Sequence, residues 1–203
     1  MFETGSDGRR LLLASTSPFR RELLARLGLP FTVQAPAVDE TRLPGEAAPA
    51  LVARLAEQKA RAVARAAPTT LIIGSDQVAV LDDDIIGKPG DHPHAVAQLQ
   101  RASGRTVIFY TGLCLLDSTS GQCQVTVEEF RVIFRSLTAP MIEAYLQREQ
   151  PYQCAGSFKS EGLGIALFER LEGDDPTSLI GLPLMRLTRM LETAGIAVLG
   201  VTS

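Results

Sequence analysis

Cationic and acidic side chains recur along this chain, and their types suit phosphate chemistry. The cationic positions Arg20, Lys59, Lys88 and Lys159 are far apart, and short polar segments stand out at residues 15–20, 39–40, 74–77, 87–89 and 156–162. Arginine and lysine bind phosphate groups, whereas aspartate and glutamate accept protons or hold metal ions. The combination predicts a site that binds phosphates and hydrolyses them.

Two of these segments follow short apolar runs, which places their polar side chains at the ends of predicted buried strands. The apolar run 11–14 precedes Ser15, and the apolar run 71–73 precedes Gly74. In sheets that are covered by helices, ligands bind at such carboxyl ends. We therefore expect both segments to contribute to one site.

A helix is predicted directly after the first strand. Ser17 is a good N-cap, Pro18 fits the first helical position, and Gly28 ends an apolar stripe that begins at Phe19. Free backbone N–H groups at the start of a helix attract anions. Arg20 adds a positive charge at the same place, so this turn is a predicted anion site.

Lys59 lies on the apolar stripe of a helix that is predicted over residues 46–66. Its neighbours on that face are Val52, Leu55, Ala56 and Val63. A lysine in such a place is costly unless its stem snorkels to solvent or its ammonium group meets an anion. The sequence leaves both interpretations open.

Other polar residues have ordinary structural interpretations when each is taken alone. Asp76 could be a turn residue, Lys88 a solvated loop lysine, and Asp39 and Glu40 a pair of solvated acids. Only their combination favours a site.

The sequence lacks the common nucleotide-binding and metal-binding patterns. Neither a P-loop motif nor a G-x-G-x-x-G motif occurs. We interpret Asp82–Asp84 as the tip of a hairpin, not as a metal site, and His92 and His94 as residues of a helix start.

Further along the chain, the hydrophobic pattern predicts strands and helices in mixed order. Strands are expected around residues 31–33, 71–75, 105–116 and 122–134 and through Leu167, a hairpin at 78–86, and helices at 94–102, 138–148 and 184–193. We expect a disordered N-terminal extension over residues 1–10 and a single domain over residues 11–203.

Composition argues against several classes of protein. The 203 residues carry a formal net charge of −3, which does not suit a nucleic acid polymer as ligand. The three cysteines form no C-x-x-C motif, so a reducing cytoplasm is expected, with neither a disulfide framework nor a zinc site. No apolar stretch approaches membrane-spanning length, and residues 1–10 are too polar for a signal peptide.

Several segments together resemble the signature blocks of the Maf family of nucleoside triphosphate pyrophosphatases. They are Ser15–Arg21, Asp39–Glu40, Glu57–Ala60, Gly74–Val78, Gly87–Pro89 and Cys154–Gly162. The resemblance implies a two-lobed α/β fold, similar to inosine triphosphate pyrophosphatases, with an elongated mixed sheet flanked by helices and an active-site cleft between the lobes. It also implies a homodimer, a divalent metal ion and a cytoplasmic location.

Within that family, the chain resembles the branch of 7-methyl-GTP pyrophosphatases. The dTTP and UTP branch typically has Ala-Asp-Thr where this chain has Ser75, Asp76 and Gln77, and usually has Arg at the position of Phe19. The resemblance implies that Asp76 is the proton acceptor and that Phe19, Gln77 and Glu161 determine specificity. Phe19 departs from the tryptophan that this branch usually has there.

The cationic base of 7-methyl-GTP suits these specificity residues. Phe19 offers an aromatic face, and Glu161 offers a carboxylate that accepts from the N1–H and N2–H groups of guanine. Gln77 both donates and accepts, so we expect it on the O6 side of the base.

The residue types and the resemblance together lead to an expected mechanism. Water attacks the α-phosphorus in line and pyrophosphate leaves, while Asp76 takes the proton or, together with Glu40, holds Mg²⁺ or Mn²⁺. The phosphate groups are expected to bind Ser15, Arg20, Lys59, Lys88 and Lys159.

Two alternatives stay open. One is a pyrophosphatase of the same family that acts on dTTP, UTP or CTP, against which Gln77 argues. The other is a nucleotide-binding regulator of cell division, and such a protein gains nothing from carboxylates that face phosphates unless a metal ion bridges them.

Overall fold

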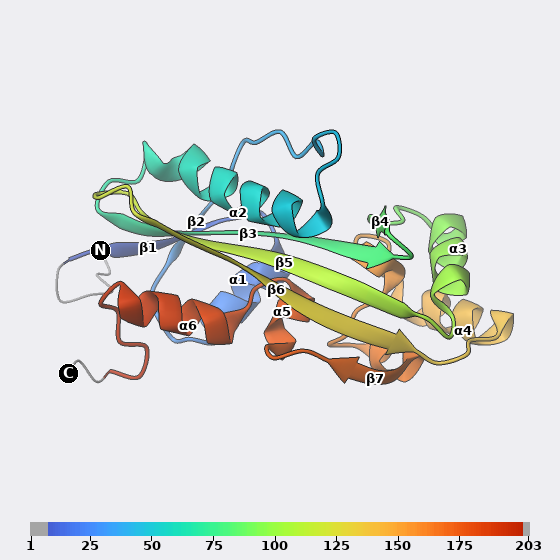
Figure 1. Ribbon diagram of the computed structural model, residues 1–203. Coiled ribbons are helices and arrows are strands. Elements are labelled where there is room, and N and C mark those ends of the chain that lie inside the picture. Colours follow the sequence, from blue (N-terminus) through green and yellow to red (C-terminus); the bar gives the residue numbers. More distant parts are fainter. Residues whose placement is uncertain (1–7, 201–203) are drawn as a thin grey trace.

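The protein is built around a mixed β-sheet that extends along its length (Figure 1). The computed structural model describes residues 8–200. Within them the strands are β1 (Arg10–Ala14), β2 (Thr32–Gln34), β3 (Thr70–Leu81), β4 (Asp84–Ile86), β5 (Thr106–Asp117), β6 (Cys123–Phe134) and β7 (Phe168–Glu172). Their order is β2-β1-β3-β5-β6-β7, and β4 pairs with β3. β1 runs parallel to β2 and β3, whereas the other pairs are antiparallel.

Helices flank this sheet, which confirms the predicted α/β class with an elongated mixed sheet. The helices are α1 (Pro18–Ala25), α2 (Ala48–Ala64), α3 (His92–Ala102), α4 (Ala139–Glu149), α5 (Pro176–Ile180) and α6 (Leu184–Thr193), and two 3-10 helices, η1 (Ala155–Ser157) and η2 (Leu163–Leu167), precede β7. The predicted start of the first helix is confirmed, because the Ser17 side chain accepts from the backbone N–H of Arg20.

Three sequence-based boundaries were wrong. The strand expected at residues 71–75 and the first arm of the hairpin expected at 78–86 form one continuous strand, β3, so Asp76 and Gln77 lie within a strand and not after its end. Residues 1–7 of the expected N-terminal extension lie outside the described residues. Arg10, the last residue of that expected extension, instead belongs to β1, and its N–H donates to Thr69 O. The strand expected through Leu167 begins instead at Phe168. The preceding residues form η2, because the chain turns tightly where the Gly164 N–H donates to Lys159 O.

The expected structural roles of the aspartate run and the two histidines are confirmed. Asp82 and Asp83 have positive φ angles of 51° and 69° and connect β3 to β4 as a hairpin turn. His92 and His94 lie in the first turn of α3, whose N-cap is Asp91.

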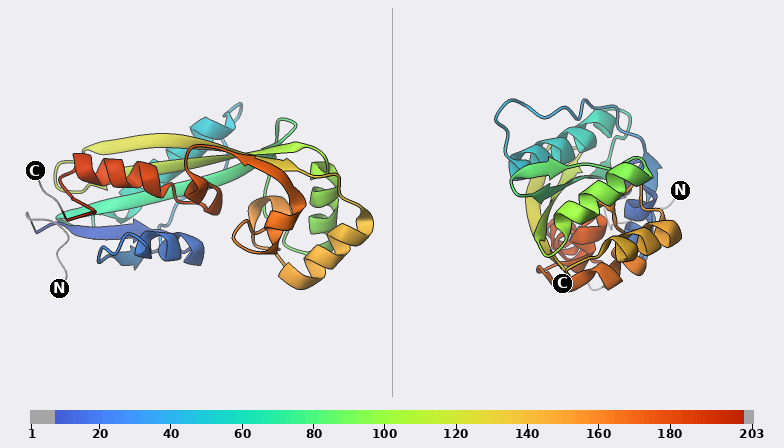
Figure 2. Two further views of the ribbon diagram at one scale, coloured as in Figure 1. Left: turned by 90° about the horizontal axis from the view of Figure 1, so that it is seen from below. Right: turned by 90° about the vertical axis from the view of Figure 1, so that its right-hand side faces the viewer.

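The two faces of the sheet are covered by different helices. Successive side chains of a strand point to opposite faces, so Ile72 packs with α2 whereas Ile73 packs with α1 and α6. Phe109, on the same face as Ile73, belongs to a further cluster with α3 and α4. Figure 2 shows α1 and α6 beside one half of the sheet and α3 and α4 at its other end.

Helix α2 lies very close to the sheet because glycines face it. A Cβ atom at Gly74 would lie 2.0 Å from Ala56 O, and one at Gly112 would lie 2.1 Å from Val52 O. Any larger residue at either position would push the helix outward. The close approach brings Lys59 of α2 down onto β3.

One edge of β3 has a gap between its two partner strands. β1 ends at Ala14, opposite Gly74, and β4 ends at Ile86, opposite Ala79. Among the described strands none pairs with residues 75–78 on this edge. Because β1 is parallel and β4 antiparallel to β3, the chain leaves both strands toward this gap.

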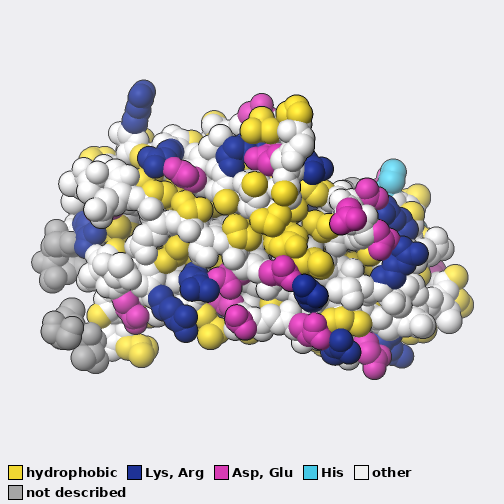
Figure 3. All heavy atoms as spheres, in the orientation of Figure 1, with side chains coloured by type: hydrophobic (Ala, Val, Ile, Leu, Met, Phe, Trp, Pro, Cys, Tyr) yellow, Lys and Arg dark blue, Asp and Glu magenta, His cyan; other side chains and the backbone are white. Residues whose placement is uncertain are grey.

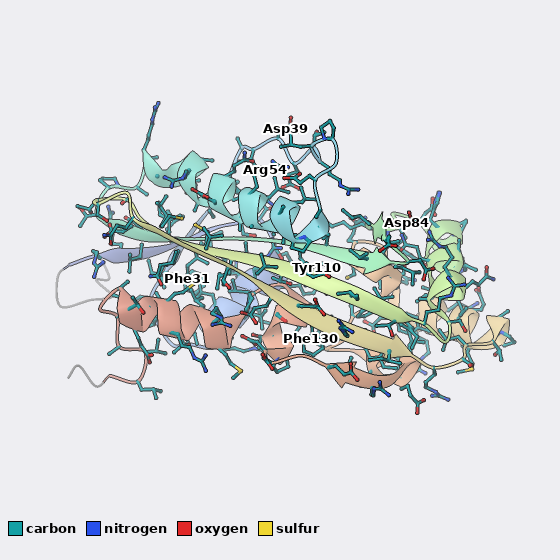
Figure 4. The ribbon with its side chains drawn as sticks, in the orientation of Figure 1. Phe31, Asp39, Arg54, Asp84, Tyr110 and Phe130 are labelled. Atoms are coloured by element: carbon teal, nitrogen blue, oxygen red, sulfur yellow. The ribbon has the colours of Figure 1, made fainter. Side chains whose placement is uncertain are left out.

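The surface carries charges of both signs. Figure 3 shows basic and acidic side chains interspersed on one face, with hydrophobic side chains gathered near its middle. Tyr110 lies in this area, as Figure 4 shows in the same orientation. None of the helices in the described part of the chain is long and apolar enough to cross a membrane.

Candidate active site

A pocket of about 440 Å³ lies at the gap in the edge of β3. Its walls contain all of the expected site residues except Lys159, namely Ser15, Phe19, Arg20, Glu40, Lys59, Asp76, Gln77, Lys88 and Glu161. Residues after β1 and β4 reach it because both strands end there. The gap therefore explains why segments so far apart in the sequence meet.

Lys59, Asp76 and Glu40 form a charged cluster in this pocket. Lys59 Nζ lies 2.6 Å from Asp76 Oδ1 and 2.8 Å from Glu40 Oε1. Lys59 is 6% exposed and Asp76 is 7% exposed, whereas the Glu40 side chain is 61% exposed. The ammonium group of Lys59 thus meets anions inside the protein instead of snorkelling to solvent.

The turn after β1 presents Arg20 and backbone groups to the same pocket. Ser15 is buried, and its Oγ accepts from the Ser17 N–H at 3.1 Å. Burial lowers the pKa of the Arg20 guanidinium, while the Asp76 and Glu40 carboxylates oppose this shift. Arginine stays protonated in proteins, so Arg20 is a fixed positive charge near both carboxylates.

Backbone carbonyls at the end of α5 hold Arg20 and Gln77 in place. Gly181 O accepts from Arg20 Nε at 2.8 Å and from Ser75 Oγ at 2.9 Å. The φ angle of Gly181 is 120°, which favours glycine there. Ser178 O accepts from Gln77 Nε2 at 2.8 Å. Helix α5 is therefore a support for both side chains.

Lys88 and Glu161 are exposed charged groups on the pocket wall. Neither makes an ion pair within the described residues. Among residues 8–200, the one hydrogen bond of the Glu161 side chain is accepted from Ser160 Oγ at 3.3 Å. Both side chains are available to a ligand.

Lys159 is placed differently from the other expected phosphate-binding residues. It does not line the pocket, and its Nζ lies 3.2 Å from Glu149 Oε1 and donates to Glu149 O at 3.2 Å. Glu149 also accepts from the Leu163 N–H. Lys159 therefore ties α4 to the loop that carries Glu161.

The loop that carries Glu40 is fastened to α2 by Arg54. Arg54 Nε and Nη2 donate to the Glu46 carboxylate at 2.6 and 2.8 Å, and Nη2 also donates to Thr41 O. Figure 4 shows Asp39 of this loop close to Arg54 of α2. The hydrogen bonds from Arg54 lower the pKa of Glu46 to about 2. The position of Glu40 therefore depends on the hydrogen bonds that Arg54 donates to Glu46 and Thr41.

Sequence reasoning missed α5 and several apolar wall residues. Phe109, Phe158, Leu179 and Ile180 line the pocket. A signal for α5 was present, because Asp175 and Pro176 have the N-cap and first-turn pattern of a helix, and Gly181 follows it. The helix is too short to show hydrophobic periodicity.

Similarity to known proteins extends over nearly the whole chain. The profile of the family described as Maf-like protein matches residues 10–194. A 7-methyl-GTP pyrophosphatase of Nitrosococcus oceani is 62% identical over 189 residues, which cover 93% of this chain and 95% of that protein. Proteins of the same name from Pseudomonas fluorescens and Vibrio cholerae are 59% and 57% identical and cover 92% and 94% of this chain and 97% and 98% of their own lengths. This chain is a member of the Maf family.

Proposed function

We propose that this protein hydrolyses 7-methyl-GTP to 7-methyl-GMP and pyrophosphate. The observation that carries the proposal is the pocket at the gap of β3, where three cationic and three acidic side chains meet Gln77 and Phe19. The charged side chains are Arg20, Lys59, Lys88, Glu40, Asp76 and Glu161. Relatives that bear the name of this activity are 54–62% identical over nearly their full lengths.

The chemistry follows from the buried carboxylate. Water attacks the α-phosphorus, the bond from that phosphorus to the bridging oxygen of the β-phosphate breaks, and pyrophosphate leaves. Asp76 is positioned by Lys59 and takes the proton of the water. Arg20 and Lys88 neutralise the charge that grows on the phosphate oxygens and on the departing pyrophosphate.

The donor set fits a divalent cation with oxygen ligands. Glu40 and Asp76 already converge on one positive group, the Lys59 ammonium. Mg²⁺ is often held by one or two carboxylates together with substrate phosphates, so two protein ligands are sufficient for it. Glu40 and Asp76 would hold Mg²⁺ or Mn²⁺, which would neutralise phosphate charge and acidify water.

The charge balance of the pocket supports a role for a divalent cation. The three carboxylates cancel the three cations, so the side chains alone leave little net positive charge for a triphosphate. A divalent cation held by Glu40 and Asp76 would restore the attraction. Lys159 could bind a phosphate group only if its ion pair with Glu149 were broken. The proposed phosphate-binding residues therefore do not include Lys159.

A panel of canonical and modified nucleoside triphosphates tests the function. With Mg²⁺ or Mn²⁺, we expect the highest kcat/KM for 7-methyl-GTP, with 7-methyl-GMP and pyrophosphate as products. The highest kcat/KM for dTTP, UTP or CTP would instead support the other enzymatic alternative. Tight binding without turnover of any triphosphate would support the regulator.

We also propose that the protein is a cytoplasmic homodimer. Val78, Val80, Ile108 and Tyr110 are only half-buried on the sheet face that α2 covers further along, and hydrophobic side chains gather in this area (Figure 3). Pairing of two copies through this face would bury them. Sedimentation of the wild-type protein and of Tyr110→Glu checks the dimer, because a monomeric wild-type protein would exclude it.

A further inference from the structure

The side-chain amide of Gln77 is held by several acceptors on one side. Its Nε2 lies 2.8 Å from Ser178 O, 3.1 Å from Leu179 O and 3.0 Å from Thr111 Oγ1. Thr111 faces Gln77 directly across the β3 and β5 pair, and its hydroxyl donates to Ser178 O at 2.9 Å. Thr111 and Ser178 are fully buried.

These partners determine which way round the amide lies. Backbone carbonyl oxygens only accept hydrogen bonds, so the group that faces Ser178 and Leu179 must be the NH₂ group. The Thr111 hydroxyl gives its hydrogen to Ser178 O and therefore offers a lone pair to the same NH₂ group. The reversed amide would place its oxygen against two carbonyl oxygens.

The consequence is that Gln77 offers the pocket an acceptor. Its Nε2 is engaged with α5 and β5, so Oε1 is the group left for a ligand. This revises the expected contact of Gln77 with O6 of guanine, because O6 is itself an acceptor. An N–H group of the base is the complementary partner.

We propose that Thr111 is the positioning residue for base recognition, because it fixes the Gln77 amide with Oε1 toward the base. The proposal rests on the proposed function for the identity of the base. A site that is built to accept an N–H at one position strongly rejects a base that has no N–H at that position, since its polar group is then left unpaired. Thr111 acts through Gln77 and contacts no reacting atom.

The test compares Thr111→Val with Thr111→Ser. Valine keeps the shape but removes both hydrogen bonds of the hydroxyl, whereas serine keeps the hydroxyl. The readout is the ratio of kcat/KM for the triphosphate that the wild-type protein prefers to kcat/KM for the one it uses least. We expect Thr111→Val to lower this ratio roughly tenfold and Thr111→Ser to retain it.

Control variants separate positioning from a merely structural role. Thr126→Val, a half-buried threonine on β6 that does not line the pocket, should leave the ratio unchanged. In a Gln77→Leu background, Thr111→Val should lower the ratio no further, because its effect passes through Gln77. An unchanged ratio in Thr111→Val, or an equal loss in Thr111→Ser, would overturn the proposal. If the preferred triphosphate is not 7-methyl-GTP, the proposed function fails while the same ratio still tests Thr111.

Discussion

Lys59 Nζ lies 2.6 Å from Asp76 Oδ1 in the interior of the protein, where both residues are less than a tenth exposed. The pair exists because Gly74 and Gly112 allow α2 to approach the sheet closely. It orients the Asp76 carboxylate at the place where β3 has no partner strand on one edge. The position of the Asp76 carboxylate thus depends on packing between a helix and a sheet.

Asp76→Asn should abolish most of the pyrophosphate release while the protein stays folded. Removal of a general base typically costs about 10²–10⁴-fold in rate. Lys59 keeps Glu40 as an ionic partner, so its charge stays compensated. Asp82→Asn at the hairpin turn of the same strand is the matched control, and near-normal turnover in Asp76→Asn would refute the role of Asp76.

Lys59→Met should lower both activity and stability. The substitution leaves the Asp76 carboxylate buried without a counter-charge, and such a loss costs about 3–5 kcal/mol. Lys59→Met combined with Asp76→Asn should regain much of the stability in chemical denaturation but none of the activity. If Lys59→Met alone is as stable as the wild-type protein, the buried pair does not contribute as described.

Gly74→Ala should displace α2 and lower activity per folded molecule. The new Cβ would lie 2.0 Å from Ala56 O, which is backbone and unable to rotate away. Overpacking of this kind typically costs about 1–3 kcal/mol. Gly87→Ala is the control for loss of a glycine, because no atom lies within 4 Å of a Cβ there. Equal melting temperatures for the two variants would contradict the tight approach.

Glu161→Gln and Phe19→Ala should each lower the preference for 7-methyl-GTP over UTP. A neutral amide loses the charge-assisted hydrogen bond to a cationic base, and alanine loses the aromatic face. The expected change in the ratio of kcat/KM values is roughly ten- to a hundredfold. Glu169→Gln on β7, an exposed glutamate away from the pocket, should leave the ratio unchanged. A uniform loss of activity on both substrates would show that these residues support the pocket instead of reading the base.

Glu46→Gln should loosen the loop that carries Glu40. Arg54 lowers the pKa of Glu46 from 4.5 to about 2, so the pair is intact above pH 4.5 and is lost as the pH falls through about 2. At neutral pH, the variant should be cleaved by trypsin after Arg42 roughly two- to fivefold faster than the wild-type protein. Glu22→Gln, which removes an exposed pair on α1, is the control. Equal cleavage rates would mean that Arg54 does not restrain the loop.

The sequence by itself determined the class of the fold and most of the pocket residues. The apolar runs located β1 and the first part of β3, and the N-cap Ser17 with Pro18 marked the start of α1. The polar residues after the second run did not mark a strand end, because β3 continues through them to Leu81. These signals are local, because hydrophobic periodicity, helix capping and turn formation each involve residues within a few positions of one another in the chain. Lys59 on an apolar stripe indicated an anion but did not identify it.

The tertiary structure alone decided how these residues are paired. The gap in the edge of β3 depends on where β1 and β4 end in register with it, which no local pattern encodes. The anions of Lys59, the partner of Lys159 and the orientation of the Gln77 amide involve residues 10 to 102 positions away. These three side chains take their partners from charged groups and carbonyl groups that come together only when α2, α4 and α5 pack onto the sheet.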